Sequence, residues 1–447
     1  MSTRRHPSSI KDASPLAQPL KFEFSGRCAP NRFLKASMTE RLSTRDYDNT
    51  QNRGIPTPNT INIYKKWGEG GWGHILTGNV MIDYSQLEAP GNLIIPLDAP
   101  FHGRRFEAYQ ELARQAKTHG CLISAQVSHP GRQVARQINP DPICASEGKL
   151  DVEFMGMTFA KPHAASQAEL RTVIEQFTHA SEFLYKAGFD GIQLHGTHGY
   201  LLAQFLYKST NHRTDQYGGS LSNRTRLLLE VASSIRQKVP ASTGFILGIK
   251  LNSVEFQEDG FDAIEAREVC ELLEGAAFDY VELSGGTYED TAMTHRRESS
   301  RRREAFFLNF AEKIVPSLHK TKSYVTGGFQ TLTGMVNALK TVDGVGLARA
   351  PCHEFDLAKK MLSGEVSGSI AAAVDPSDHG IQELIAGAQM RQVAKGQAPL
   401  HVSRTEIVAE FLKEVKVWED KMTSMDPYFY GYPDVVNTLH VNSREHL

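Results

Sequence analysis

The stretch Ser166–Gly196, SQAELRTVIEQFTHASEFLYKAGFDGIQLHG, decides the fold because it joins one complete helical pattern to one complete strand. Its apolar residues recur at helical spacing, which predicts a helix with one buried face. They are Leu170, Val173, Ile174, Phe177, Ala180 and Leu184. Ser166 and Glu169 fit a capping box at the start of this helix, and Gly188 can end it. The apolar run at 191–194 then predicts a short buried strand.

The same alternation of apolar runs and helical patterns continues between residues 21 and 353. It is typical of repeated βα units with a parallel sheet. The predicted strands are FLKASMT (33–39), GHILTGNV (73–80), CLISAQVS (121–128), GIQLHG (191–196), FILGIKLN (245–252), YVELSGG (280–286), YVTGG (324–328) and DGVGLA (343–348). Eight such units favour an α/β fold of the (β/α)8 TIM barrel type. The alternative, a doubly wound sheet, should open with a glycine-rich turn, and none follows the first predicted strand.

The domain boundaries follow from this pattern. We expect residues 1–20 to form a flexible leader and residues 21–368 to form the barrel. Residues 369–447 carry further helical patterns and predict a helical extension that packs on the barrel or on a partner subunit. Two insertions, 129–162 and 287–303, follow the third and sixth strands. They therefore fall at the C-terminal mouth, where barrel enzymes build their substrate loops.

Composition narrows the class of protein. Lys and Arg number 49 against 51 Asp and Glu in 447 residues, so no excess charge points to nucleic acid or to an acidic membrane. No apolar run reaches the roughly 18–20 residues that span a bilayer, and the N-terminus lacks the apolar core of a secretory signal. The five cysteines are scattered without a CxxC pair, which argues against structural zinc and iron–sulfur clusters. We expect a cytoplasmic protein with no metal, and a homo-oligomer is compatible with the extension.

Polar and small residues gather at the predicted strand ends, where the chemistry of a barrel enzyme collects. The set comprises Thr39, Gly78, Gln126, His195 with His198, Lys250, Gly327 with Gly328, and Gly346 with Arg349. The glycines after the seventh and eighth strands suit backbone N–H groups that approach a phosphate. The sequence therefore predicts a site at this mouth with a phosphate group at one side.

The segment 195–231, HGTHGYLLAQFLYKSTNHRTDQYGGSLSNRTRLLLEV, resembles the hallmark segment of the old yellow enzyme family of FMN-dependent ene-reductases. In that family an H-x-x-[HN]-G-Y-L-[LI]-x-Q-F-L run leads to N-x-R-x-D-x-Y-G-G-S and then to N-R-x-R. The resemblance extends from about residue 21 to about residue 362. It implies a barrel that binds FMN noncovalently.

The resemblance also implies which residues bind the flavin. Thr39 would hydrogen-bond the O4/N5 edge, Gln126 the pyrimidine side, and Lys250 would lie near N1/O2. The full implied set is Ala36, Ser37, Met38, Thr39, Gly78, Gln126, His195, Lys250, Gly327, Gly328, Phe329, Gly346 and Arg349. Two positions depart from the family pattern: Lys250 stands where an arginine is usual, and Ala348 where a glycine is frequent.

The catalytic residues implied by the resemblance are His195, His198 and Tyr200. A conjugated carbonyl that accepts hydride at its β-carbon builds negative charge on its oxygen, which two imidazole N–H groups can hold. Tyr200, a neutral phenol, can give the α-carbon its proton. A cation at Lys250 would stabilise the negative charge of reduced flavin.

Each of these residues also has a simpler explanation. The histidine pair could bind a metal ion, although the nearby strand ends offer no third Asp, Glu or Cys ligand. Tyr200 could be a packing aromatic, and Lys250 a solvated lysine. The run NHRTDQYGGS at 211–220 is more typical of turn chemistry that fixes a loop than of catalysis.

These observations predict an FMN-dependent oxidoreductase that takes hydride from NADH or NADPH. Its partner would be a small molecule, an α,β-unsaturated carbonyl compound whose activated C=C bond is reduced. The absence of a cysteine cluster argues against the iron–sulfur dienoyl-CoA reductase branch. Two alternatives stay open: a flavin-dependent dehydrogenase or isomerase of a pathway metabolite, and a phosphate-binding barrel without redox chemistry.

Overall fold

The computed structural model describes residues 3–46, 48–148, 150, 158–252, 261–285, 307–376, 378–424 and 431–435. Its strands are β1 (Leu20–Lys21), β2 (Cys28–Ala29), β3 (Phe33–Lys35), β4 (His74–Met81), β5 (Leu93–Ile94), β6 (Leu122–Ser128), β7 (Ile143–Cys144), β8 (His163–Ala164), β9 (Gly191–Gly196), β10 (Ile246–Asn252), β11 (Tyr280–Ser284), β12 (Lys322–Thr326) and β13 (Gly344–Leu347). Its α-helices are α1 (Pro58–Glu69), α2 (Gly103–Ala116), α3 (Gln167–Lys186), α4 (Leu201–Leu206), α5 (Leu221–Lys238), α6 (Ala263–Gly275), α8 (Leu308–Ile314), α9 (Leu332–Ala338), α10 (Ala350–His353), α11 (Leu357–Leu362), α12 (His379–Ala394) and α13 (Thr405–Ser424). Short 3-10 helices cover Thr50–Asn52, Ala241–Thr243 and Val315–Ser317.

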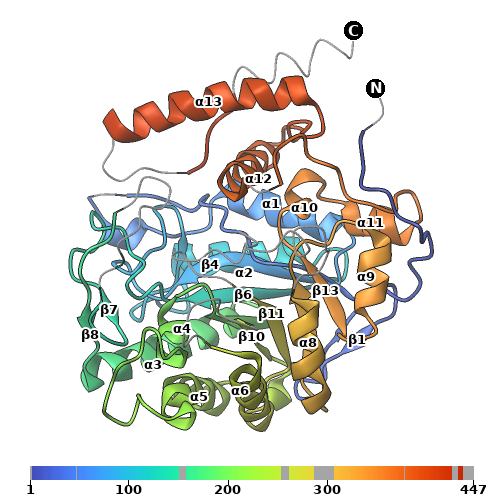
Figure 1. Cartoon of the computed structure of the whole chain (residues 1–447). Coiled ribbons are helices and arrows are strands. Elements are labelled where there is room, and N and C mark those ends of the chain that lie inside the picture. The colour runs from blue at the N-terminus through green and yellow to red at the C-terminus, as the bar shows by residue number, and fades with distance from the viewer. Residues whose placement is uncertain are drawn as a thin grey trace.

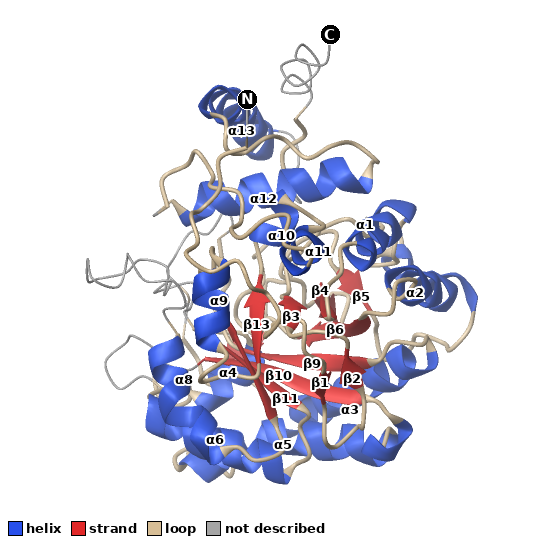
Figure 2. Cartoon of the chain, turned by 90° about the vertical axis from the view of Figure 1, so that its right-hand side faces the viewer, coloured by secondary structure: helices blue, strands red, loops and turns tan. Residues whose placement is uncertain are grey.

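The central sheet closes on itself. Strands β3, β4, β6, β9, β10, β11, β12 and β13 pair in parallel around a ring, and β3 joins β13 on one side to β4 on the other. Helices surround this ring (Figure 2). The predicted (β/α)8 barrel is therefore confirmed, and the doubly wound alternative is wrong because an open sheet has no such closing pair. The short β5 pairs with the carboxyl end of β4, at Val80 and Met81, and was not expected.

Helix α3 forms as its sequence predicts. The side chain of Ser166 accepts a hydrogen bond from the backbone N–H of Glu169, and the carboxylate of Glu169 accepts one from the backbone of Ser166. Gly188 follows the helix with a φ of 87°, a conformation that glycine adopts without steric cost. The capping box and the glycine stop are both confirmed.

The alternation of side chains along each strand separates two hydrophobic cores. Outward residues such as Ile192, Leu194 and Val281 pack beneath the surrounding helices. Inside the ring, Phe22 from the β1–β2 hairpin packs with residues near the start of the barrel strands, including Tyr280 and Tyr324. Because this apolar plug fills one end of the barrel, polar side chains collect at the opposite end, beyond the carboxyl ends of the strands.

The N-terminal segment, predicted as a leader, contacts the barrel at several points. Arg5 donates to both carboxylate oxygens of Glu354 at 2.7 Å, and the N–H of His6 donates to Ser369 O at 3.0 Å. Leu16 is fully buried. These contacts place residues 3–20 on the surface of the barrel; the domain boundaries themselves stay a prediction.

The predicted extension is helical. Helices α12 and α13 lie beyond one end of the barrel, with α12 next to α1 and α10 and with α13 outermost (Figure 1). Of the predicted substrate loops, 287–303 lies outside the described residues, and 129–162 is described except at 149 and 151–157. Among the helices that the structure describes, none combines the length and the apolar character required to cross a membrane.

Candidate active site

Neighbouring strands bring His195 and Lys250 together at the open end of the barrel. The two residues are register partners on β9 and β10, and Lys250 is in turn the register partner of Glu282 on β11. His195 is 4% exposed, Lys250 5% and Glu282 fully buried. A lysine buried this deeply is not a solvated surface lysine, so that simpler explanation of Lys250 is wrong.

The rings of His195, His198 and Tyr200 form one cluster. The ring centroids of His195 and Tyr200 lie 4.1 Å apart, and those of His195 and His198 lie 5.5 Å apart, with edge-to-face geometry in both pairs. His198 adopts a φ of 58°, which is unfavourable for a residue with a Cβ and is often found where a side chain is aimed for function. Tyr200 directly precedes α4 and is 4% exposed.

Both imidazoles are neutral in this environment. Burial lowers the pKa of His195 well below its usual value, with further lowering from His198 and Lys250. Burial, assisted by Lys250, lowers the pKa of His198 to about 3. A neutral imidazole keeps one N–H donor. The Nδ1 atom of His195 is buried and has no hydrogen-bond partner within the described part of the chain, so it is available to a bound molecule.

A chain of hydrogen bonds crosses the barrel interior below these rings. The Ser37 hydroxyl donates to Gln126 Oε1 at 2.8 Å, and Gln126 Nε2 donates to Gln193 Oε1 at 2.7 Å. Gln193 Nε2 donates to Glu282 Oε2 at 2.7 Å, and Lys250 Nζ lies 3.2 Å from Glu282 Oε1. Sequence reasoning missed Gln193 and Glu282. Each is a polar residue inside an apolar run, two positions from another residue that points into the barrel. This pattern could have identified both.

The first strand is shorter than predicted and ends at Lys35, so Ala36 to Thr39 form a loop at the mouth. The N–H of Ala36 still bonds Leu347 O at 2.8 Å. The Thr39 hydroxyl accepts from Asn79 Nδ2 at 3.0 Å, and the Thr39 carbonyl accepts from the Tyr432 hydroxyl at 3.0 Å. Asn79 and Tyr432 were not predicted, and Tyr432 comes from the C-terminal segment.

Gly78 lies against this loop with no room for a side chain. A Cβ at this position would lie 2.6 Å from Met38 O and would also collide with the carboxylate of Glu40. The N–H of Gly78 donates to the Tyr64 hydroxyl at 2.9 Å, and that hydroxyl donates to Glu40. Burial raises the pKa of the Glu40 carboxyl. The hydrogen bonds from Gly78 to Tyr64 and from Tyr64 to Glu40 therefore fix the position of the Gly78 peptide. The sequence did not indicate this role for Tyr64 and Glu40.

The predicted phosphate glycines lie on adjacent strand ends. Gly346 on β13 is the register partner of Thr326 on β12, and Gly327 and Gly328 follow Thr326 directly. Gly328 has a φ of 73° with open space where a Cβ would stand. Phe329, the next residue, is buried at 5% exposure.

Arg349 lies after β13 at the start of α10, as the sequence order requires, but its side chain contacts the extension. Its guanidinium hydrogen-bonds Gln382 and lies 3.4 Å from His379 Nδ1, both on α12. Burial lowers the pKa of this guanidinium. Its contact with a phosphate stays a prediction, and in this structure α12 holds the side chain in place.

The described residues contain no group of three or more His, Cys, Asp or Glu side chains arranged to hold a metal ion. His195 lies close to His198, Tyr200 and Lys250. A nearby lysine disfavours a bound cation through charge repulsion.

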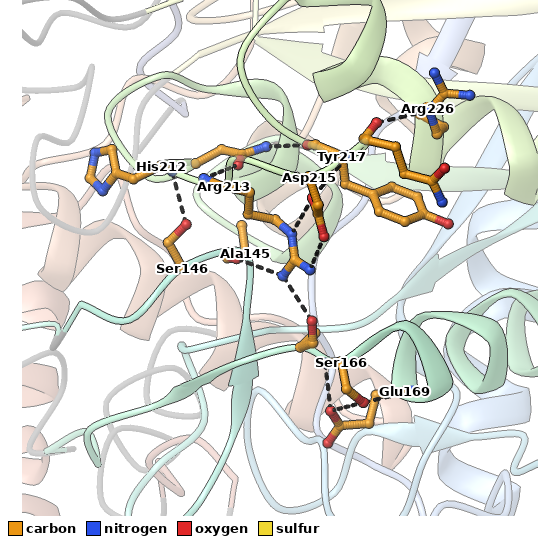
Figure 3. Close-up of polar contacts among 12 residues, drawn as sticks. Ala145, Ser146, Ser166, Glu169, His212, Arg213, Asp215, Tyr217 and Arg226 are labelled. Carbon is orange, nitrogen blue, oxygen red and sulfur yellow. Dashed lines mark hydrogen bonds and ion pairs between the residues drawn. The ribbon is translucent and has the colours of Figure 1, made fainter.

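The NHRTDQYGGS run, predicted to have a structural role, acts as a clamp between two loops (Figure 3). Arg213 pairs with Asp215 through both carboxylate oxygens, at 3.1 and 2.6 Å. Its Nη1 donates to Ala145 O at 3.1 Å and to Ala165 O at 2.8 Å. Ala145 and Ala165 follow β7 and β8, so Arg213 ties the loop after the third barrel strand to the loop after the fourth.

We predict that Arg213→Ala lowers the free energy of unfolding by about 1–3 kcal/mol, because two carbonyls lose their donor and Asp215 loses its partner. Arg226→Ala is the matched control, since Arg226 donates to Gln216 O at an exposed contact of 2.8 Å. The control should change stability by less than about 0.5 kcal/mol. Denaturant unfolding of both variants measures the difference, and equal losses would contradict the clamp.

Several known proteins are similar to this chain in sequence or in fold. The sequence model described as the NADH:flavin oxidoreductase / NADH oxidase family matches residues 15–364. The chain is 48% identical over 409 residues to the NADH-dependent flavin oxidoreductase nadA of Aspergillus parasiticus, covering 91% of this chain and 92% of that protein. It is 31% identical over 209 residues to 12-oxophytodienoate reductase 1 of Oryza sativa subsp. japonica, and the match covers 43% of this chain and 54% of that protein. Morphinone reductase in complex with tetrahydroNAD shares the fold, with a TM-score of 0.62 and 22% identity over 79% of this chain and 92% of that one.

Proposed function

Because the chain belongs to the NADH:flavin oxidoreductase / NADH oxidase family, which includes the old yellow enzymes, we propose that it reduces the activated C=C bond of an α,β-unsaturated carbonyl compound. Membership makes it an oxidoreductase with FMN as cofactor and a nicotinamide nucleotide as hydride donor. The barrel without redox chemistry is thereby ruled out. We propose NADH as the donor on the name of the Aspergillus relative. The cluster of His195, His198 and Tyr200 carries the proposal for the substrate.

The residues at the mouth fit FMN. A flavin ring needs polar groups along one edge. Gln126 contacts Ser37 in the loop that follows β3, and Gln193 and Glu282 connect Gln126 to Lys250. A phosphate needs exposed backbone N–H groups, and Gly328 offers a left-handed turn with open space beside it. The unpartnered Nδ1 of His195 is a buried polar atom of the kind that a ligand satisfies.

FMN, when bound, would supply the hydride chemistry between the nicotinamide and the β-carbon of the acceptor. His195 and His198 hold the carbonyl oxygen of the acceptor through one N–H each. Their neutral state suits this task, because a neutral imidazole can donate without the desolvation cost of a buried charge. The negative charge that develops on the oxygen strengthens both hydrogen bonds.

Tyr200 completes the reaction by giving its hydroxyl proton to the α-carbon. Its ring lies against His195, so the groups that would hold the oxygen and protonate the carbon stand side by side. A phenol is neutral at pH 7 and can protonate a strong carbon base. Lys250 would stabilise the negative charge of reduced FMN.

The cofactor is tested first. We predict that the purified protein is yellow and that denaturation releases FMN in an amount equal to that of the protein, as measured by chromatography of the supernatant. FAD in the supernatant, or no flavin even after reconstitution, would contradict the proposed site.

The reaction is then tested in two halves under anaerobic conditions. NADH and NADPH are each used to bleach the flavin, and the reduced protein is mixed with a simple cyclic enone. We expect faster bleaching with NADH and recovery of the yellow colour with the enone. Bleaching without recovery by any enone would leave an NADH-dependent flavoprotein and contradict the proposed substrate class.

A further inference from the structure

A fully buried carboxylate, Glu282, ends the hydrogen-bond chain inside the barrel. It lies on β11 in register with Lys250, and their side chains are 0% and 6% exposed. Its Oε2 accepts from Gln193, whereas its Oε1 has no hydrogen bond in the described structure and only the ion pair with Lys250 at 3.2 Å. Burial of this charge costs free energy, and the attraction to Lys250 offsets part of that cost.

The carboxylate determines how the two amides point. An ionised carboxylate can only accept hydrogen bonds. Gln193 must therefore present its Nε2 to Glu282 and its Oε1 to Gln126. Gln126 must in turn use Nε2 toward Gln193, so its Oε1 accepts from Ser37. Through Gln193, Glu282 therefore determines which atom of the Gln126 amide donates and which accepts. Gln126 is the residue proposed to contact the flavin edge.

A glycine makes this contact possible. Gly248 on β10 stands between Gln193 on β9 and Tyr280 on β11 in the strand register. A Cβ at Gly248 would collide with the Tyr280 ring. With no side chain on β10 at this level, Gln193 reaches across that strand to the carboxylate on β11.

We propose that Glu282 is a positioning residue for the flavin: it balances the charge of Lys250, orients the amides of Gln193 and Gln126, and so lowers the reduction potential of bound FMN. The inference rests on the proposed contact of Lys250 and Gln126 with the flavin. A negative charge behind Lys250 weakens the positive potential that reduced flavin meets, and such an effect is strong where water is excluded.

The test is the midpoint potential of the FMN-loaded protein, measured by equilibration with a reference dye. Glu282→Gln keeps the shape and removes the charge. We expect the equilibrium to move at least about tenfold toward reduced FMN, which corresponds to a rise of about 30 mV for a two-electron couple. A flavin-loaded variant with the wild-type potential would overturn the inference.

A double variant guards against loss of folding, since Glu282→Gln leaves a buried lysine without its partner. Lys250→Met alone should lower the potential, and Lys250→Met with Glu282→Gln should lie above Lys250→Met, near the wild type. A double variant with the same potential as Lys250→Met would show that Glu282 contributes nothing to the flavin and would overturn the inference.

Asp279→Asn is the matched control. Asp279 is a fully buried carboxylate that directly precedes β11, at the far end of the barrel, paired with Arg236 at 2.9 Å. Its removal should lower thermal stability and leave the potential unchanged. If Glu282→Gln behaves like Asp279→Asn, the role of Glu282 is structural. Absence of FMN in the wild-type protein would instead contradict the proposed function, so the two failures are distinguishable.

Discussion

Tyr200→Phe is expected to slow the reoxidation of the reduced protein by a simple enone by on the order of 10²-fold or more, the usual scale for a lost general acid. FMN content and reduction by NADH should stay near wild type, because hydride transfer from a nicotinamide needs no such proton. The change removes a hydroxyl and little volume from a ring that is 4% exposed. Stopped-flow absorbance of the two half-reactions measures the difference.

Two controls accompany this variant. Tyr217→Phe removes another hydroxyl, which donates to Glu230 at 2.9 Å in the clamp segment, and should leave both half-reactions unchanged. Nitroalkenes, whose reduced anion is stable before protonation, should be much less affected by Tyr200→Phe than enones. Equal slowing of both half-reactions would mean that Tyr200 is a packing aromatic, and no slowing would mean that another group supplies the proton.

His195→Ala is expected to lower the rate of enone reduction by about 10²–10³-fold, the effect of removing one donor from a developing oxyanion. The same variant should weaken the binding of flat phenolate ligands, which perturb the flavin spectrum when they stack on the ring. His198→Asn should be tolerated better than His198→Ala, because an amide retains an N–H donor. Spectral titration with a phenol, beside steady-state rates, measures both effects.

The pH dependence follows from the direction of the pKa shifts. Burial lowers the pKa of His198 to about 3 and that of His195 well below its usual value. Both imidazoles therefore stay neutral across the range of about pH 5 to 8 in which an ordinary histidine titrates. Phenolate binding should show no histidine titration in that range. Loss of activity with a chelator and its recovery with zinc would instead favour the metal site.

The sequence alone determined the features that are local in the chain. Helical spacing and the capping box located α3, and apolar runs located the barrel strands, because both signals lie within one element. His195, His198 and Tyr200 form a cluster because they lie within six consecutive residues at the end of β9, too few to separate their rings far. The charged and amide residues inside the barrel were only partly predicted. Gln126 and Lys250 stand near the ends of their predicted strands, whereas Glu282 lies in the middle of its predicted strand, 280–286, although the structure places it in register with Lys250.

The tertiary structure decided which distant residues meet. Gln193 contacts Glu282 across 89 residues of chain, and Tyr432 contacts the carbonyl of Thr39 across 393. Neither contact has a local signal, because it depends on strand register, on ring closure and on where α12 and the C-terminal segment dock. Local propensity constrains only spacing within an element, whereas the position of one element against another is decided by packing of the whole molecule. The ends of the strands could therefore be predicted as a site, but the carboxylate behind that site could not.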